Sequence, residues 1–395
     1  MSQPEGYRDL IQTGPEIDLR AELAKLAERA RVLRFDAAPN PCVGAAVLSA
    51  DGRVLGVGFT QGWGGNHAEI EALEAAQLAG ATRDEMNTLL VTLEPCSTTG
   101  KTGPCTQAIV DAGLRRVVIG ALDPDPRHRG AGLEVLRQAG IEVERVDGAT
   151  RLEEVAPHFL RWIDYERLRR PRPWVIAKWA QTRSGQLSPP EDVGEGRWIS
   201  SEASREEVQQ LRTRVDAIVT GVGTVRADDP RLTLRGAAAE SGAMAPMRIV
   251  LDSELATPAD AKLFQPDGPG ESGGPVYILC RAGASPKRHR DLTDAGARVH
   301  GLRPDADGRV QLRGALEWMW RFGARRVLLE AGPTLVRAFY DAGFIDQYRV
   351  YTGSINGGQG EGLGDILARG GLVDRLDREV GPDSVFEAFT PAIRR

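Results

Sequence analysis

The chain has 395 residues, and its 50 Lys and Arg against 55 Asp and Glu give a formal net charge of −5. Charged residues make up 27% and hydrophobic residues 41%, which is typical of a globular protein with room for two or more domains. No basic stripe is present, which disfavours nucleic-acid binding, and the apolar runs are far shorter than the ~20 residues of a membrane span. Four cysteines are too few for a disulfide scaffold. The N-terminus lacks a signal-peptide pattern, so we expect a cytoplasmic location.

The first part of the chain predicts helices that alternate with short strands. Residues 1–15 are polar and are expected to form a flexible extension. Apolar residues at helical spacing predict a helix over 16–35, and the turn at Asp51-Gly52 joins strands 43–48 and 54–59 in a predicted hairpin. Further helices are expected at 67–78, 104–112 and 133–139, and further strands at 88–93, 116–121 and 141–146. This alternation indicates an α/β layered domain over residues 16–147.

A predicted domain boundary follows. A helix over 150–169 ends at Pro171 and Pro173, so residues 148–173 are expected to be a linker helix. A second alternating series occupies residues 174–395. Its strands are expected at 174–178, 217–221, 248–251, 276–280, 327–330 and 347–351, and its helices at 201–214, 314–322 and 334–342. Two stretches rich in Gly, Ala and Pro, at 236–246 and 265–275, are expected to be surface loops.

One histidine and two cysteines have the spacing of a zinc site. His67 opens a predicted helix, Cys96 follows a predicted strand, and Cys105 lies nine residues later. One imidazole and two thiolates supply three corners of a tetrahedral zinc site and leave the fourth for water, as hydrolysis requires. Glu69 lies two residues from His67, near enough to move a proton from that water to a leaving amine. The signature of zinc nucleobase deaminases is His-x-Glu followed by Pro-Cys-x-x-Cys, and this chain matches it except for a longer spacing between the cysteines.

Each part of this pattern also has a structural explanation. His-x-Glu is a common tripeptide, and cysteine pairs often only pack in cores. The helix and strand positions of the two segments favour the zinc site over coincidence. Eight residues separate the cysteines, and this insert carries Lys101 among glycines and hydroxyls, which favours a substrate with a terminal phosphate. The alternative for Lys101 is a solvated surface lysine.

Six motifs make the chain resemble a known enzyme family over nearly its whole length. They are PNPCVG at 39–44, HAE at 67–69, LEPC at 93–96, WISS at 198–201, GVGTV at 221–225 and EAGPTL at 330–335. The family is that of the bifunctional riboflavin-biosynthesis deaminase/reductases. The resemblance implies an α/β chain with an N-terminal, cytidine-deaminase-like three-layer domain. It also implies a C-terminal domain that is similar to dihydrofolate reductase.

The resemblance implies two successive reactions and two cofactors, Zn²⁺ and NADPH. The first is hydrolytic removal of the ring amine of 2,5-diamino-6-(ribosylamino)-4(3H)-pyrimidinone 5′-phosphate. The second is reduction of the ribosyl side chain to ribityl. In the deaminase it places zinc on His67, Cys96 and Cys105, the proton shuttle at Glu69 and a pyrimidine contact at Asn40.

The resemblance also implies binding residues in the reductase domain. The NADPH positions are Lys178, Ala180, Trp198, Thr224, Asp228, Ser253 and Gly332, and the substrate positions are Arg212, Leu232, Arg235 and Glu330. A homo-oligomer is implied as well. Without the resemblance, this half is only a nucleotide-binding α/β unit, because GVGT after a strand is weak evidence for a dinucleotide site.

Four positions depart from the family pattern and keep two other functions open. Thr60 and Thr98 stand where the family has histidines, Ser184 replaces an aspartate, and Gly196 replaces a serine. One alternative is a deaminase for a related phosphorylated aminopyrimidine with a retuned reductase domain. The other is a C-terminal half that senses a nucleotide without catalysis.

The remaining histidines and cysteines show no ligand spacing. Cys42 and Cys280 are expected to be small buried hydrophobic residues. The histidines, which are His128, His158, His289 and His300, are expected at the surface or as caps.

Overall fold

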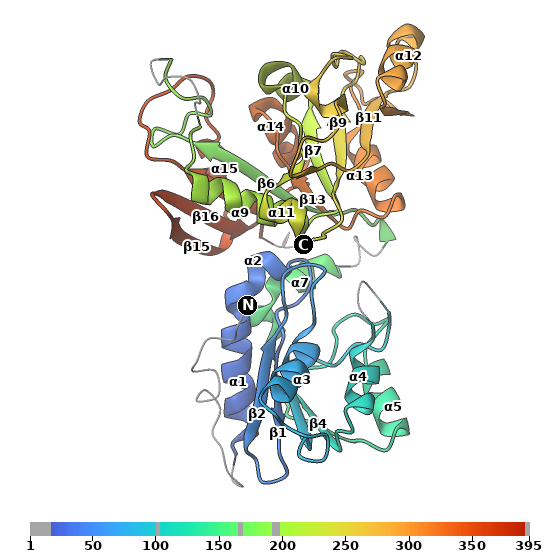
Figure 1. The fold of residues 1–395 in the computed structure, drawn as a ribbon, viewed down its shortest axis with the longest axis vertical. Helices are drawn as coiled ribbons and strands as arrows, with labels where there is room; N and C mark the ends of the chain where they lie inside the picture. Colours follow the sequence, from blue (N-terminus) through green and yellow to red (C-terminus); the bar gives the residue numbers. More distant parts are fainter. Residues whose placement is uncertain (1–16, 100–102, 165–168, 192–197, 392–395) are drawn as a thin grey trace. The chain divides into compact units, whose positions relative to one another are not determined.

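The computed structural model describes residues 17–99, 103–164, 169–191 and 198–391, and the chain divides into two compact units. The first unit comprises residues 1–168 and the second 169–395. Each unit has its own main sheet and its own hydrophobic core (Figure 1). Among the described residues, we find no helix with both the length and the apolar character of a membrane span.

The first unit is built on a five-stranded sheet. Its strands are β1 (Gly44–Leu48), β2 (Val54–Phe59), β3 (Thr88–Val91), β4 (Arg116–Ile119) and β5 (Glu142–Arg145). They are ordered β2-β1-β3-β4-β5. β1 is antiparallel to β2, which confirms the predicted hairpin, and it is also antiparallel to β3. β3, β4 and β5 run parallel, so their carboxyl ends lie at one edge of the sheet.

Helices cover both faces of this sheet and confirm the predicted three layers (Figure 1). They are α1 (Leu19–Ala30), η2 (Arg31–Leu33), α2 (Arg34–Ala37), α3 (Ala68–Leu78), α4 (Cys105–Asp111), α5 (Ala131–Gln138), α6 (Leu152–Val155) and α7 (Pro157–Trp162). Leu90 and Val118 share a core with α1, whereas their neighbours Leu89 and Val117 share one with α3, α4 and α5. Successive side chains of a strand point to opposite faces, so each strand supplies both cores.

Two glycines on β2 allow α3 to pack directly against the sheet. A Cβ at Gly56 would lie 2.4 Å from the backbone oxygen of Ala72, and one at Gly58 would lie 2.3 Å from the backbone nitrogen of Ala72. No side chain fits in that space, so glycine is required at both positions. The close contact fixes α3, whose first turn carries part of the HAE motif.

The predicted linker helix is interrupted. α6 and α7 replace it, separated at Ala156, which has φ −142° and ψ 49°. Pro157 causes the interruption, because a residue that precedes proline is driven out of the helical region. Ala156 and Phe159 belong to a core of the first unit, so residues 148–164 pack with that unit. The predicted extension over 1–15 lies outside the described residues.

The second unit contains a nine-stranded sheet and a short ribbon of β8 (Leu234–Arg235) with β10 (Glu271–Ser272). The sheet strands are β6 (Trp174–Gln181), β7 (Ala217–Gly221), β9 (Met247–Leu251), β11 (Val276–Arg281), β12 (Arg298–Leu302), β13 (Arg326–Leu329), β14 (Gln347–Thr352), β15 (Val373–Val380) and β16 (Asp383–Phe389). Their order is β12-β11-β9-β7-β13-β6-β14-β16-β15. Neighbours from β12 to β14 run parallel, and β16 and β15 extend the sheet as antiparallel strands.

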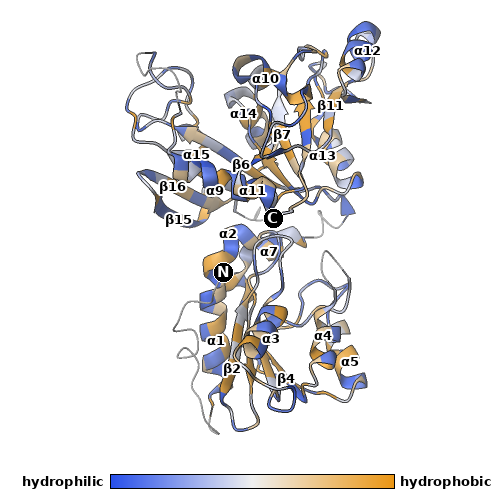
Figure 2. Cartoon of the chain, in the orientation of Figure 1, coloured by the Kyte–Doolittle hydropathy of each residue, from blue (hydrophilic) through white to orange (hydrophobic). Residues whose placement is uncertain are grey.

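Helices enclose the parallel part of this sheet. They are α9 (Glu202–Thr213), α10 (Val222–Asp228), α11 (Ala237–Glu240), η3 (Lys262–Phe264), α12 (Pro286–Asp294), α13 (Leu312–Arg321), α14 (Pro333–Asp341) and α15 (Gly364–Arg369). Hydrophobic residues concentrate in the strands of both units (Figure 2). Parallel strands that are buried on both faces read as continuous apolar runs, which is why the sequence predicted most of them.

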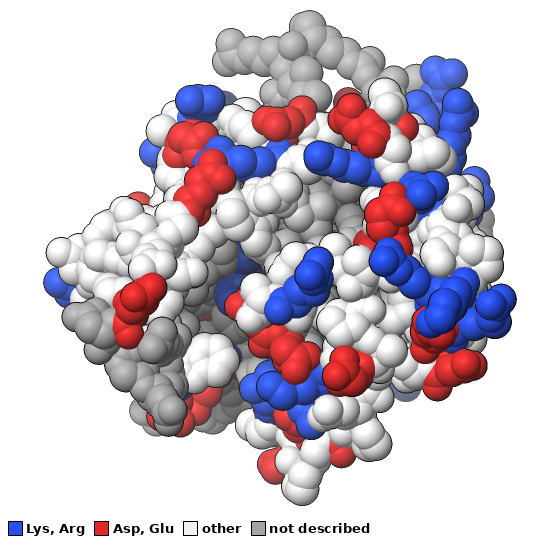
Figure 3. Space-filling view, turned by 90° about the horizontal axis from the view of Figure 1, so that it is seen from above, with Lys and Arg blue, Asp and Glu red and all other residues white. Residues whose placement is uncertain are grey.

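Several of the elements that the sequence did not predict are polar. α12 is mostly hydrophilic (Figure 2), and β15 alternates exposed and half-buried residues, so neither forms an apolar run. β12 and β16 were also missed, and the two predicted loops contain α11 and β10. On the face drawn in Figure 3, Lys and Arg side chains lie among Asp and Glu side chains without a continuous basic band.

Candidate active sites

The three predicted zinc ligands meet near the carboxyl end of β3. His67 is the N-cap residue of α3, Cys96 follows β3, and Cys105 is the first residue of α4. Nδ1 of His67 lies 3.6 Å from Sγ of Cys96 and 3.3 Å from Sγ of Cys105. One ligand atom of each residue lies within 4.8 Å of the other two. An imidazole nitrogen and two sulfurs this close together fit zinc, and they leave one tetrahedral position for water.

Glu69 completes this site from the first turn of α3. It is 3% exposed, and burial raises the pKa of its carboxyl group while the charge of His67 acts in the opposite direction. Hydrogen bonding by the Cys105 thiol lowers the pKa of Cys96 to about 4, which favours the thiolate form that binds metals. A buried carboxyl group next to three metal ligands has the position that a proton shuttle needs.

Glu94 is a residue to which the sequence assigned no role. It is 6% exposed, and its carboxylate accepts hydrogen bonds from the backbone N–H groups of Asp123 at 3.1 Å, Gly130 at 2.9 Å and Gly132 at 3.0 Å. A Cβ at Gly132 would lie 2.1 Å from the backbone oxygen of Pro95. The loop over 123–132 therefore packs directly on the segment that carries Cys96. The LEPC motif contains Glu94, but nothing in the motif indicates which loop it holds.

The predicted substrate residues of this unit are Asn40 and Lys101, and the structure describes only the first of them. Asn40 lies in the turn after α2, and its backbone oxygen accepts a hydrogen bond from Nε2 of His158 at 2.9 Å. His158 is 2% exposed, so the expectation of a surface or capping histidine is wrong there. Lys101 lies outside the described residues. The hydroxyl oxygen of Thr60 accepts a hydrogen bond from the N–H of Val43 at 3.1 Å, so this departure from the family pattern is bonded to the backbone that leads into β1.

Three predicted residues of the reductase form a buried ionic cluster. Nε of Arg212, on α9, donates to Glu330 at 2.9 Å, and Nζ of Lys178, on β6, lies 3.9 Å from the same carboxylate. Burial by itself raises the pKa of Glu330, but the charges of Arg212 and Lys178 outweigh it and lower that pKa to about 2. Burial lowers the pKa of Lys178, and Glu330 opposes this effect.

Further arginines surround this cluster. Nε of Arg235, on β8, lies 3.7 Å from Glu271, and Nη1 of Arg231 lies 3.6 Å from the same residue. With Lys178 and Arg212, these cations outnumber the carboxylates of Glu330 and Glu271 four to two, which favours binding of an anion. Leu232 lies nearby in the sequence, is buried, and has a φ of 55°, an uncommon conformation for a residue with a side chain.

Four predicted NADPH residues lie at the carboxyl ends of neighbouring parallel strands. Ala180 is near the end of β6, Thr224 follows β7, Ser253 follows β9, and Gly332 follows β13. Open parallel sheets bind their ligands at this edge. The hydroxyl oxygen of Thr224 accepts a hydrogen bond from the N–H of Gly332 at 3.0 Å, so these two residues touch. Gly332 is also the N-cap of α14, a position suited to a phosphate group.

Asp228, Ser253 and Trp198 are further predicted NADPH residues of the second unit. Asp228 ends α10, and burial raises its pKa. The hydroxyl oxygen of Ser253 accepts a hydrogen bond from the N–H of Val310 at 2.9 Å. Trp198 is 59% exposed, and the guanidinium of Arg205 lies 5.2 Å from the centroid of its ring.

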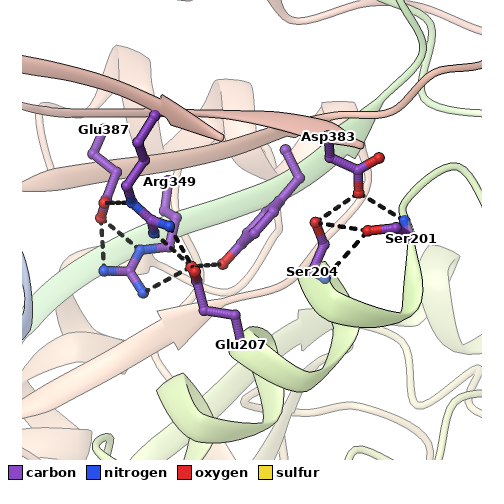
Figure 4. A network of polar contacts seen from close by, with 8 residues as sticks. Ser201, Ser204, Glu207, Arg349, Asp383 and Glu387 are labelled. Atoms are coloured by element: carbon purple, nitrogen blue, oxygen red, sulfur yellow. Dashed lines mark hydrogen bonds and ion pairs between the residues drawn. The ribbon is translucent and has the colours of Figure 1, made fainter. Parts of the chain in front are cut away.

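A second ionic network, drawn in Figure 4, was not predicted. Glu207 of α9 accepts hydrogen bonds from the hydroxyl of Tyr351 at 2.7 Å and from Nη2 of Arg378 at 2.6 Å. Glu387 accepts from Nε of Arg349 at 2.6 Å and from Nε of Arg378 at 3.0 Å. The ring centroid of Tyr351 lies 5.9 Å from Nζ of Lys178. The network therefore ties α9, which carries Arg212, to β14, β15 and β16.

The folds and the two sites define a class of protein: a zinc-binding deaminase joined to an NADPH-dependent reductase. Two sequence families match these parts. The cytidine and deoxycytidylate deaminase zinc-binding region matches residues 19–121, and the RibD C-terminal domain matches residues 173–375.

Relatives extend the match over most of the chain. The chain is 34% identical to the riboflavin biosynthesis protein RibD of Aquifex aeolicus, and the match covers 84% of this chain and 85% of that protein. It is 33% identical to RibD of Escherichia coli, over 92% of this chain and 96% of that protein. Acinetobacter baumannii RibD superposes with a TM-score of 0.63 at 28% identity, over 94% of this chain and 99% of that one. The chain belongs to the RibD family, and it is a bifunctional deaminase and reductase of riboflavin biosynthesis.

The name of a further protein of solved structure includes both a deaminase and a reductase activity. It is a diaminohydroxyphosphoribosylaminopyrimidine deaminase/5-amino-6-(5-phosphoribosylamino)uracil reductase from Thermotoga maritima. Its TM-score is 0.62 at 26% identity, and the match covers 94% of this chain and 99% of that one. Both units of the chain therefore have a counterpart in one solved protein.

Proposed function

We propose that the first unit hydrolyses the ring amine of 2,5-diamino-6-(ribosylamino)-4(3H)-pyrimidinone 5′-phosphate and that the second unit reduces the ribosyl group of the product with NADPH. Family membership and the name of the Thermotoga maritima relative support this substrate. The observation that carries the first reaction is the convergence of His67, Cys96 and Cys105 next to buried Glu69.

In the first unit, the side chains hold the zinc ion and move a proton from the attacking water to the leaving amine. His67, Cys96 and Cys105 are the zinc ligands, and zinc supplies a bound water that is acidic enough to react near neutral pH. One carboxylate oxygen of Glu69 accepts a proton from the attacking water and returns it to the ring amine, which leaves as ammonia. Asn40 contacts the pyrimidine, and Lys101 contacts the 5′-phosphate.

In the second unit, the protein binds two anionic molecules close together. NADPH supplies the hydride. Its binding residues are Lys178, Ala180, Trp198, Thr224, Asp228, Ser253 and Gly332. The excess of cations around Arg212, Arg235 and Glu330 attracts the phosphorylated substrate, and Leu232 forms part of its site.

The test follows the substrate mass by chromatography and mass spectrometry, with and without NADPH. We expect loss of the ring amine without NADPH and addition of two hydrogens once NADPH is present. Glu69→Gln should lower the rate of deamination by several orders of magnitude. It should leave the rate at which the deaminated compound is reduced unchanged, because the substitution removes the proton shuttle only. Deamination by Glu69→Gln at nearly the normal rate contradicts the assignment.

We further propose that the protein is a cytoplasmic homo-oligomer. The family resemblance supports the assembly. Light scattering of the purified protein tests the assembly, and a monomer mass at all concentrations contradicts it.

A further inference from the structure

We infer that His158 of α7 is a positioning residue for the deaminase site, because it holds the backbone of Asn40. This inference rests on the proposed contact between Asn40 and the pyrimidine. Nε2 of His158 lies 2.9 Å from the backbone oxygen of Asn40. A carbonyl oxygen only accepts hydrogen bonds, so Nε2 carries the proton and donates it.

The hydrogen bond completes the anchoring of a short turn. The N–H of Asn40 donates to the backbone oxygen of Ala37 at 3.0 Å, and the backbone oxygen of Asn40 accepts from His158. Both peptide groups of Asn40 are therefore held, which restricts the direction in which its side chain leaves the backbone. Asn40 itself is half-buried, so part of the residue remains accessible to a substrate.

His158 is a rigid support for this turn. It is 2% exposed, and its neighbours Ala156 and Phe159 belong to the hydrophobic core that also contains Ala68 and Ala72 of α3. α3 carries Glu69 in its first turn. One packed core thus connects the helix that holds the Asn40 turn with the helix that holds the proton shuttle.

This contact extends the deaminase site beyond the deaminase motifs. The match to the zinc-binding region ends at residue 121, and His158 lies in a segment that the sequence predicted as a linker. The deaminase site thus depends on α7 as well. A histidine that only stabilised the unit would change its unfolding temperature, whereas a positioning residue also changes substrate binding.

The experiment compares two variants of the full-length, zinc-loaded enzyme. His158→Phe keeps a planar ring, somewhat larger than the imidazole, and removes the donor. His158→Gln keeps an N–H donor at a similar distance. We expect His158→Phe to raise the deaminase KM about tenfold with a smaller change in kcat, and His158→Gln to stay within about threefold of the unchanged enzyme. Zinc content and reductase turnover should not change in either variant.

A double-mutant cycle separates this inference from the proposed role of Asn40. Calorimetry in the Glu69→Gln background measures substrate binding by Asn40→Ala, His158→Phe and the double variant. The inference requires that His158→Phe weakens binding when Asn40 is present and has little effect once Asn40 is alanine. Equal increases in KM for His158→Phe and His158→Gln overturn the inference alone. Normal binding by His158→Phe beside weak binding by Asn40→Ala does so as well. Normal binding by Asn40→Ala overturns the proposed role of Asn40.

Discussion

At the scale of single residues, Glu330 shows how neighbouring cations keep a carboxylate ionised in this fold. Its carboxylate lies between Arg212 and Lys178 and is largely shielded from solvent. These two cations lower its pKa to about 2 although desolvation acts in the opposite direction. In the unfolded chain the same group has a pKa near 4.5. The ionised carboxylate therefore stabilises the folded second unit. This contribution is fully present above about pH 4.5 and is lost as the pH falls toward 2.

We predict that Glu330→Gln lowers the stability of the second unit at pH 7 by about 3 kcal/mol, the equivalent of the pKa difference. The advantage of the unchanged protein should shrink as the pH falls from about 4.5, because the unfolded chain then gains a proton that the folded unit does not bind. Urea unfolding at pH 7 and pH 3 measures this difference. Glu379→Gln, at an exposed position on β15, is the matched control. A stability difference that stays constant across this pH range contradicts the prediction.

The residues of the two sites differ in how far the sequence predicted them. The sequence predicted His67, Cys96, Cys105 and Glu69 because their ligand chemistry and spacing are local properties, and the structure brings the first three together. The partners of Glu94 and His158 were not found, since His158 binds a residue 118 positions away in the sequence. Which buried donor meets which acceptor depends on packing, and a single sequence does not contain that information directly.

Among the elements, α3 is the one on which the deaminase site most depends. It lies against β2 without intervening side chains, because Gly56 and Gly58 leave room for its backbone. The sequence predicted both elements from their apolar patterns. It did not predict their contact, because a glycine in a strand can mark a bulge, a bend or a close approach of another backbone. Only the position of the neighbouring helix shows which of these applies.

We predict that Gly58→Ala displaces α3 and weakens zinc binding. The added Cβ would lie 2.3 Å from the backbone nitrogen of Ala72 and 2.4 Å from the backbone oxygen of Ala68, and neither atom belongs to a flexible side chain. The first unit should lose about 1–3 kcal/mol of stability, the usual cost of overpacking. Competition with a chromophoric chelator measures the zinc affinity. Gly314→Ala, whose Cβ would make only an ordinary contact at 3.5 Å, is the control, and equal zinc affinities in the two variants refute the prediction.

At the scale of the whole molecule, the chain has two candidate sites, and each lies in a unit with its own hydrophobic core. The three candidate metal ligands belong to the first unit. The ionic cluster of Lys178, Arg212 and Glu330 and the predicted NADPH residues belong to the second. Each unit has its own core, so the loss of one site does not remove the packing that supports the other.

We predict that removal of zinc by a chelator abolishes deamination and leaves NADPH-dependent reduction of the deaminated substrate within about twofold of its normal rate. Added Zn²⁺ should restore the first activity. The two rates are measured on the same sample, so the reductase serves as an internal control. Parallel loss of both activities on chelation contradicts the separation.

The sequence by itself determined the alternating α/β architecture and the family and predicted the zinc ligands, because apolar periodicity, ligand type and motif spacing are read along the chain. Only the tertiary structure decided the strand order, the packing of residues 148–164 with the first unit, and the link between Tyr351 and Glu207, which lie 144 positions apart. The physical reason is that these features are contacts between distant segments. Such contacts are chosen by the fit of whole faces and by the need of buried polar groups for partners.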